Sequence, residues 1–436
     1  MRILFVSQEL IAVELCTVLQ LEGHDLKLYI GERELRDCYD GMAEKILDWK
    51  QELDWVGKDG LIIFDDVGFG TEQDRLRNEG YRVVGGSALG DKLEIDRNYG
   101  QEVFDGCGME NILSYNFPSP EDAIEFVKAH PKVRWVVKQN GGHVSSLNYV
   151  GTLENNEDVI GVLSHYNGIG IRGIHLQQKV SGIEMGVGRY FNGNDWVGPI
   201  EMNIEHKSLM PHGIGPKTPE MGTLMWYDKD EENKLFRATL GKMRSYLKEI
   251  AFHGDIDINC IVSGDSIWPL EATARFGTPS TSCHMEIHNS PWGEFLSAIA
   301  DGVVYDLDYK PGYAMVVTVA VPPFPFTGLP QEFASEGMAI HFREKPVKDE
   351  MSHYYFEEVL YGKKHIDGMI RQQYFVAGHK GCVGYVGGAG ATIEEARTQA
   401  YGRMDNLVVP KMFYRDDIGL EFLEKDERQL KEWGWL

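Results

Sequence analysis

The sequence lacks long hydrophobic runs, paired cysteines and an excess of basic residues. No stretch of roughly 18 consecutive apolar residues occurs, so no membrane-spanning helix is predicted. The six cysteines are scattered without a Cys-x-x-Cys pair, which argues against a structural zinc site and favours reduced thiols. Lysine and arginine number 43 against 67 acidic residues, a net charge of −24. This imbalance disfavours binding to nucleic acid polymers or anionic membranes.

The first residues also lack the pattern of a signal peptide. Gln8 and Glu9 interrupt the apolar stretch, and no small-residue cleavage site follows. Together with the reduced thiols, this predicts a cytoplasmic protein. No internal repeat or low-complexity linker is present in the 436 residues, a length that suits two to four packed units.

Strand and helix patterns divide the chain into four regions, 1–90, 91–195, 196–310 and 311–436. The first alternates strand and helix patterns, which predicts a small doubly wound α/β unit. Because no glycine fingerprint follows its first strand, a dinucleotide site there is disfavoured. Helices are expected at about 9–21, at 120–130 behind a Ser119 cap, over 235–252 as one long helix, and at about 392–407.

A short strand near the middle of the chain has one polar and one small face. Glu271, Thr273 and Arg275 alternate with Ala272 and Ala274, so all three polar side chains point the same way. The question is why one strand face should carry a carboxylate, a hydroxyl and a guanidinium.

The preceding strand has the same alternation. Asp255, Asp257 and Asn259 share a face, and the turn at 263–265 would fold this strand against the next. Facing side chains in such a hairpin lie about 5 Å apart. Oxygen ligands in that arrangement suit Mg²⁺, and a guanidinium beyond them can hold a carboxylate or phosphate. The alternative is a solvated sheet face with exposed charges.

Two lysines favour the site. Lys92 lies at the start of a helical stretch, and Lys138 ends a strand before the glycine-containing loop 139–146. A lysine in either place can hold a phosphate, although each taken alone is more typical of a surface lysine. His284 and His288, four residues apart, could share a helix face, but we expect them to be structural rather than metal ligands.

The order of these pieces resembles the ATP-grasp superfamily and, more narrowly, phosphoribosylamine–glycine ligase, also called glycinamide ribonucleotide synthetase. That family carries Glu-x-Asn-x-Arg-Phe-Gly-Asp-Pro-Glu-Thr, where this chain has EATARFGTPST (271–281). Its Gly-Pro-Asn-Thr-Gly-Gly-Met-Gly loop corresponds to GPKTPEMG (215–222), and its Asp-His-Lys to EHK (205–207). Its Arg-Lys-Asp-Ile-Gly corresponds to RDDIG (415–419). The resemblance covers nearly the whole chain in the same order.

The resemblance implies an ATP-grasp fold, α/β (α+β) in class, with an N-terminal doubly wound domain and a C-terminal mixed sheet domain. Region 1–90 would be the domain preceding the ATP-grasp unit, 91–195 its small lid region and 196–310 its large region with the metal hairpin. It also implies ATP and Mg²⁺ (or Mn²⁺) as cofactors. The partners would be a small-molecule acid and a small-molecule amine, and the protein would be a monomer or homodimer.

Site roles follow position by position from the resemblance. Lys92 and Lys138 would contact ATP phosphates, Lys138 and Arg275 would be catalytic, and Arg275 would steady an acyl phosphate. Glu271, Thr273 and Asn259 would bind the metal, with Asp257 as the rival of Asn259. The remaining assignments are an adenine hinge at Gln178, Lys179 and Val180, a ribose contact at Glu184, and an acceptor side at His206, Lys207, Pro216, Lys217, Thr218, Arg415 and Asp417.

The departures from the family pattern lie mainly on the substrate side. A run that contacts the ribose phosphate is replaced by FDDVGFG (64–70), which puts Asp65 and Asp66 where an anion would bind. The loop over the ATP phosphates lacks its lysine, and Thr273 replaces an asparagine. We therefore expect an ATP-dependent carboxylate–amine ligase, similar to a purine-biosynthesis enzyme, with altered substrates. The alternative is a non-catalytic ATP-binding protein.

Overall fold

The computed structural model describes residues 1–139, 147–326, 334–366 and 368–436. Its chain begins with a five-stranded parallel sheet in the order β3-β2-β1-β4-β5. The strands are β1 (Arg2–Ser7), β2 (Asp25–Ile30), β3 (Glu44–Ile46), β4 (Leu61–Phe64) and β5 (Val83–Val84). Helices α1 (Leu15–Leu21), α2 (Leu53–Val56) and α3 (Gly70–Asn78), with 3₁₀ turns Arg33–Leu35 and Trp49–Glu52, connect them. This confirms the predicted N-terminal α/β unit.

The first helix starts later than the sequence pattern predicts. Its first residue is Leu15, because the chain after β1 forms a turn in which Leu10 has φ +69°. The backbone N–H of Leu10 donates to Ser7 Oγ and that of Ala12 to Asp65, so these groups are satisfied without a helical turn.

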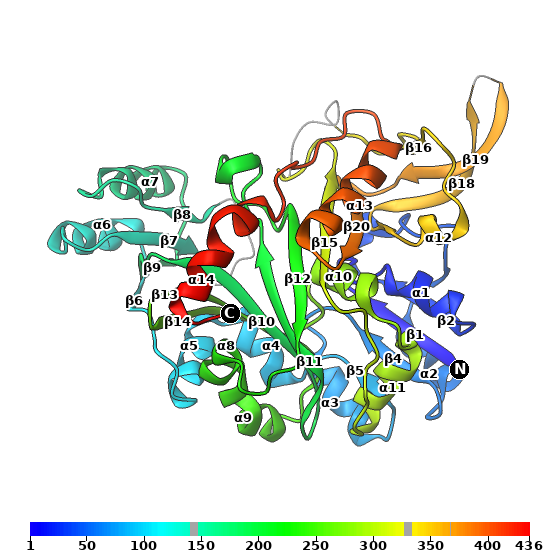
Figure 1. Cartoon of the computed structure of the whole chain (residues 1–436), viewed down its shortest axis with the longest axis horizontal. Helices are drawn as coiled ribbons and strands as arrows, with labels where there is room; N and C mark the ends of the chain where they lie inside the picture. The colour runs from blue at the N-terminus through cyan, green and yellow to red at the C-terminus, as the bar shows by residue number, and fades with distance from the viewer. Residues whose placement is uncertain (140–146, 327–333, 367) are drawn as a thin grey trace.

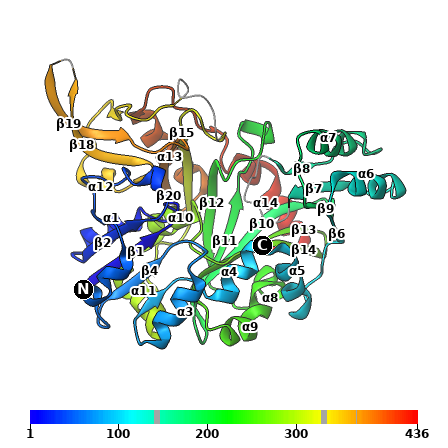
Figure 2. The same ribbon diagram turned by 180° about the vertical axis from the view of Figure 1, so that it is seen from behind.

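A second, four-stranded antiparallel sheet projects from the side of the molecule away from the N-terminal sheet (Figures 1 and 2). Helices α4 (Ala88–Ile95) and α5 (Arg97–Gly106) lead to it. Its order is β6 (Ser114–Phe117), β9 (Ile174–Gln178), β7 (Trp135–Gln139) and β8 (Tyr149–Val150). Helices α6 (Pro120–Ala129) and α7 (Glu157–Gly168) pack on it, and Ser119 caps α6 as predicted.

The third and largest sheet has eight strands in the order β14-β13-β10-β11-β12-β15-β20-β17. They are β14 (Ser266–Thr273), β13 (His253–Ser263), β10 (Ile183–Asn192), β11 (Trp196–Glu205), β12 (Gly222–Asp228), β15 (Tyr313–Ala320), β20 (Cys382–Gly390) and β17 (Tyr354–Phe356). Segments from three of the predicted regions thus share one sheet. The division into four domains stays a prediction.

The predicted long helix over 235–252 is wrong. The segment forms α8 (Lys234–Ala238), a 3₁₀ turn (Leu240–Met243) and α9 (Arg244–Glu249). The break falls at Thr239, whose φ of −129° and ψ of −100° are not helical. Its buried hydroxyl donates to the carbonyl of Leu235, which competes with the helical hydrogen-bond ladder.

The remaining elements cover the large sheet or extend it. Helix α13 (Ile393–Asn406) packs against β20, α10 (Ser280–Ile287) against β15, and α11 (Trp292–Asp301) between the large and N-terminal sheets. Strands β18 (Val359–Ile366) and β19 (Met369–Val376) form a projecting hairpin, and β16 (His341–Phe342) pairs with β21 (Leu407–Val408). The short elements are Pro211–Gly213 (3₁₀), α12 (Lys348–Met351), a π-helical turn Phe422–Asp426 and α14 (Glu427–Trp433).

No helix among the described residues has both the length and the apolar character needed to cross a bilayer.

Candidate active site

The polar hairpin forms as the alternation predicts. Strands β13 and β14 pair antiparallel, with Asn259 directly opposite Glu271 and Asp257 opposite Thr273. Ala272 lies on the other face of β14, where it is 4% exposed and belongs to the main hydrophobic core. The small side chains therefore fill the core, and the oxygen-bearing ones share the opposite face.

Glu271 lies among three cations. Its Oε2 atom accepts a hydrogen bond of 3.0 Å from the Arg97 guanidinium, and its Oε1 atom is 3.6 Å from Lys207 Nζ. Burial alone would raise the pKa of Glu271, but Lys207, Lys138 and Arg97 hold it below its usual range. Glu271 is therefore ionised at neutral pH and available as a ligand.

Lys138 approaches the same place from β7. Burial lowers the pKa of its ammonium to about 8, while the neighbouring Glu271 opposes that shift. The structure thus brings the strand-end lysine and the hairpin carboxylate together, as the sequence predicts.

Lys207 is shared by three carboxylates. Its Nζ atom lies 2.8 Å from Glu205, 3.4 Å from Glu184 and 3.6 Å from Glu271. Burial would lower the pKa of Lys207, but the three carboxylates raise it well above its usual value. This places Glu184, the predicted ribose contact, beside the predicted acceptor residue.

The pair Asn259 and Glu271 fits a divalent cation. The amide nitrogen of Asn259 donates to Glu205 Oε2 at 2.5 Å, while its Oδ1 atom is buried and has no hydrogen-bond partner among the described residues. An orphaned carbonyl oxygen opposite a carboxylate is the donor set that Mg²⁺ prefers. Thr273 lies one pair further along the hairpin, opposite Asp257.

Arg275 is fixed by two acidic residues that sequence reasoning did not assign to it. Its Nε atom is 3.0 Å from Glu94 Oε1 and 3.6 Å from Asp66 Oδ1, and its Nη1 atom donates to the carbonyl of Phe276. Glu94 additionally accepts from the backbone N–H of Ala274. The guanidinium is thereby held at the end of β14, next to the N-terminal sheet.

The structure does not bring Lys92 to this cluster. Lys92 is exposed on α4, with its ammonium 4.1 Å from the ring centroid of Tyr99. Arg97, five residues later at the start of α5, contacts Glu271 instead. Lys92 and Arg97 lie five residues apart in the same charged stretch of the sequence. Their spacing alone does not reveal which of the two side chains faces the hairpin.

The predicted adenine hinge connects two sheets. Gln178 ends β9, and the chain enters the large sheet at Ile183. The backbone N–H groups of Gln178 and Lys179 already donate to Leu113 and Arg134. Val180 follows them without a regular element. The hinge therefore remains a prediction. The backbone N–H groups of its first two residues, Gln178 and Lys179, already form hydrogen bonds at the four-stranded sheet.

The segments expected on the acceptor side do meet. His206 Nδ1 lies 3.2 Å from the carbonyl of Gly222, and its Nε2 accepts from the N–H of Gly419. Burial, together with Arg415, lowers the pKa of His206 to about 4, so its ring is neutral and the proton is on Nδ1. Through these two hydrogen bonds, His206 connects its own segment EHK (205–207) to the segments GPKTPEMG (215–222) and RDDIG (415–419).

A buried arginine and aspartate reinforce this junction. Arg415 forms two hydrogen bonds of 2.7 and 2.8 Å with Asp417 and donates to the carbonyl of Ser208. Asp417 also accepts from the N–H of His212. Arg415 and Asp417 therefore hold loops together, whatever they contact in a ligand complex.

The GPKTPEMG loop is fixed at three points. Thr218 donates to the carbonyl of Lys207 through both its N–H and its hydroxyl, and Lys217 Nζ donates to Ser208 Oγ at 3.2 Å. The carbonyl of Pro216 accepts from the N–H of Leu209. The glycine loop predicted to close over the phosphates (139–146) falls almost entirely outside the described residues.

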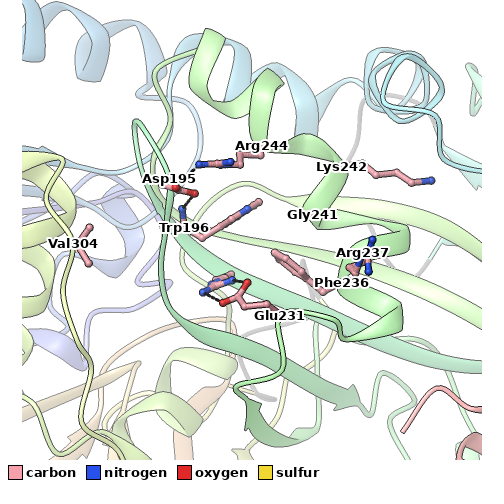
Figure 3. Close-up of a pocket in the computed structure, with 10 residues that line it drawn as sticks. Asp195, Trp196, Glu231, Phe236, Arg237, Gly241, Lys242, Arg244 and Val304 are labelled. Carbon is pink, nitrogen blue, oxygen red and sulfur yellow. Dashed lines mark hydrogen bonds and ion pairs between the residues drawn. The ribbon is translucent and has the colours of Figure 1, made fainter.

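A separate surface pocket of about 610 Å³ lies between α8, α9 and the ends of β10 and β11 (Figure 3). Two of its arginines are already paired, Arg189 with Glu231 and Arg244 with Asp195. None of the residues predicted from sequence lines it. The candidate site is therefore the hairpin cluster rather than this pocket.

Comparison with solved structures decides the fold. The phosphoribosylamine–glycine ligase of Thermotoga maritima superposes with a TM-score of 0.70 at 18% identity, covering 96% of this chain and 100% of that one. Biotin carboxylase of Campylobacter jejuni, solved as a β-γ-ATP complex, gives a TM-score of 0.63 at 13% identity over 99% and 96% of the two chains. This chain has the ATP-grasp fold.

Sequence relatives point the same way as these ATP-grasp structures. The phosphoribosylamine–glycine ligase of Corynebacterium ammoniagenes is 24% identical over 390 residues, which is 87% of this chain and 84% of that enzyme. That of Methanobrevibacter smithii is 23% identical over 436 residues, 94% of each chain. No protein-family model matches the sequence. The resemblance predicted from the motifs is thus confirmed across the chain's length.

Proposed function

We propose that this protein joins a carboxylic acid to an amine and uses ATP to drive the reaction. The observation that carries the proposal is the pairing of Asn259 with Glu271 across the hairpin, with Lys138 and Lys207 beside them on an ATP-grasp fold. The ATP-dependent ligases among its relatives support the same reaction class.

Glu271 and Asn259 would hold Mg²⁺ or Mn²⁺, with Thr273 as a weaker third ligand. The ion would offset charge on the ATP phosphates. Lys138 would hold a phosphate from the opposite side, and the segment 178–180 would bind adenine through its backbone. Lys92, whose ammonium lies 4.1 Å from the centroid of the Tyr99 ring, is left out of this proposal.

The reaction would proceed in two steps. An oxygen of the substrate carboxylate attacks the γ-phosphorus of ATP, and the β–γ bridging bond breaks to give an acyl phosphate and ADP. The amine nitrogen then attacks the acyl carbon, loses a proton and releases inorganic phosphate, leaving an amide. Arg275, fixed by Glu94 and Asp66, would stabilise negative charge on the acyl phosphate.

We propose that the substrates differ from phosphoribosylamine and glycine. Asp66 lies in the segment where the family resemblance would place the ribose phosphate, 3.6 Å from Arg275 Nε, and Glu94 lies beside the same guanidinium. Asp65, the other acidic residue of that loop, is buried and accepts from Ser7 and Ala12, so its role is structural. A phosphate bound beside Asp66 would be repelled by its carboxylate.

The test is a search for a new amide. Protein, ATP and Mg²⁺ are incubated with pools of amino acids and amines, and products are read by mass spectrometry alongside ADP release. An amide that needs ATP and disappears in Glu271→Gln supports the proposal. ADP release from phosphoribosylamine plus glycine at a normal enzyme's rate would overturn the altered-substrate part.

Thr273 favours a second candidate, a protein that binds ATP without turning it over. Its hydroxyl is a weaker metal ligand than the amide that the family carries. Calorimetry with and without Mg²⁺ separates the two functions. Tight ATP binding without any product across the whole screen supports the second and contradicts the first. In either case we expect a monomer or homodimer that acts on small molecules.

A further inference from the structure

A second group of polar side chains is buried deeper in the large sheet. Glu201 on β11, Asp255 on β13 and His284 on α10 are 2%, 3% and 1% exposed. One ligand atom from each lies within 4.8 Å of the others. The group belongs neither to the hairpin pair Asn259–Glu271 nor to the acceptor-side loops.

The contacts of His284 fix which ring nitrogen faces the two carboxylates. Tyr227 Oη is hydrogen-bonded to His284 Nδ1 and lies 2.6 Å from His288 Nε2. Because a hydroxyl has one proton, Tyr227 donates to one of these two rings and accepts from the other. A neutral His284 that donates from Nδ1 to Tyr227 leaves its Nε2, which faces Glu201, free to bind a metal ion.

The approach of His284 to Glu201 is not a well-formed hydrogen bond. Nε2 is 2.9 Å from Glu201 Oε2, yet it has no partner in hydrogen-bond geometry among the described residues. A proton on Nε2 would therefore point off the line to the carboxylate. Two ligands about 2.1 Å from one ion are separated by about 3.0 Å at right angles and by about 3.4 Å at a tetrahedral angle, so the observed 2.9 Å is closer to the right-angled spacing.

Negative charge in this group is not balanced by a nearby lysine or arginine. Within the described ranges, the only ion pair of Glu201 is the one with His284, and Asp255 has none. Asp255 Oδ1 is also without a hydrogen-bond partner. Asn203 donates to both Glu201 and Asp257 and so draws a third acidic residue toward the group. Burying such charge unpaired is costly.

We propose that Glu201, Asp255 and His284 bind a divalent transition-metal ion, Zn²⁺ or Mn²⁺. One imidazole and two carboxylates form a donor set for these ions. Tyr227 and Asn203 orient two of the ligands through their hydrogen bonds, as second-layer residues do around metal ions. The ligand atoms, which lie within 4.8 Å of one another, would move closer together around one ion.

This ion would be distinct from the one that the proposed ligase function needs. Asp255 precedes Asn259 by four residues on the same strand, which separates them by about 13 Å. The buried ion would tie β11, β13 and α10 together, and α10 directly follows the segment that carries Arg275. The inference does not depend on the ligase proposal.

The experiment measures metal bound to the full-length protein without nucleotide. Chelator-treated protein is dialysed against Zn²⁺ or Mn²⁺ alone, and metal per chain is determined by plasma mass spectrometry. We expect about one equivalent, and at least a tenfold loss of affinity in Asp255→Asn and in His284→Gln. The matched control is Glu357→Gln, a buried carboxylate elsewhere that Tyr385 contacts, which should keep its metal.

Two further measurements keep the outcome decisive. Glu271→Gln should retain the nucleotide-independent ion even if it loses ATP-dependent metal, which separates this proposal from the ligase function. If the cluster variants do not fold, anomalous diffraction from wild-type crystals soaked in Mn²⁺ decides. A peak between Glu201, Asp255 and His284 supports the site. Absence of that peak, or metal binding unchanged in the folded variants, overturns it.

Discussion

At the scale of single residues, two lysines that were both predicted to contact ATP phosphates have different surroundings in the structure. Lys138 lies in the electrostatic environment of Glu271, whereas Lys92 rests on the ring of Tyr99 at the surface. An ammonium that holds a phosphate contributes about 1.5–3 kcal/mol, or about 10- to 100-fold in affinity. Calorimetric titration with ATP and Mg²⁺ should therefore show a weakening of about that size in Lys138→Met.

The matched control is Lys92→Met, for which we expect less than about a threefold change, as for most surface substitutions. Equal losses in the two variants would mean that Lys92 reaches the nucleotide in the complex. That result would contradict the arrangement described for the isolated chain.

Arg275 should matter for turnover more than for ATP binding. Its Nε and backbone contacts fix a planar guanidinium that lysine cannot reproduce. Arg275→Lys should lower the rate of amide formation by about 100-fold, the order seen when a charge-stabilising donor is lost, with little change in ATP affinity. Arg82→Lys, in a surface pair with Asp301, is the control and should retain full activity.

At the scale of elements, the helix caps are the clearest link from sequence to stability. Thr392 accepts from the N–H of Glu395, whose side chain returns to the N-terminus of α13 in a capping box. Thr392→Ala should lower the free energy of unfolding by about 1 kcal/mol in urea denaturation. Thr398→Ala in the same helix, whose hydroxyl only bonds back to Glu394, should have no such cost.

Elements with a strong local pattern could be predicted from the sequence, and those set by distant contacts could not. The alternation in 253–275 predicted both the hairpin and its polar face, because side-chain period is a local property. The helix over 235–252 was predicted whole, because apolar spacing does not reveal that Thr239 bonds to Leu235. Arg97 and Glu94 were missed for a related reason, since their partners lie about 180 residues away.

The same limit explains why the surroundings of His284 and His288 could not be predicted from the sequence. His284 and His288 were expected to be structural, and four-residue spacing on a helix gives no further information. Only the fold brings Glu201 and Asp255 from two strands of the large sheet against His284.

At the scale of the whole molecule, buried carboxyl groups gather where the N-terminal and C-terminal parts meet. Burial raises the pKa of Glu357 to about 8 and those of Glu358 and Glu14 to about 7. Glu14 precedes α1 and accepts from Ser282, while Tyr39 donates to the carbonyl of Phe356. These groups bind protons more tightly in the folded protein than in the unfolded chain.

The sign of the pH effect follows from these raised values. The stabilising contribution of the protonated carboxyls is fully present below the ordinary pKa of 4.5 and is lost as pH rises through about 7–8. The melting temperature should fall between pH 5 and pH 8.5, and less so in Glu357→Gln. Differential scanning calorimetry measures this, and an unchanged slope in the variant would contradict the raised pKa of Glu357.

The register of the hairpin restricts how this protein can change over evolutionary time. Asn259 faces Glu271 because of the length of the turn between Ser263 and Ser266 together with a one-residue register shift between Cys260 and Asn259. One residue added there would exchange the faces of Glu271 and Ala272, sending a carboxylate into the hydrophobic interior and a methyl group toward the nucleotide. A change in the length of that turn would therefore disturb the site more than a point substitution at its rim.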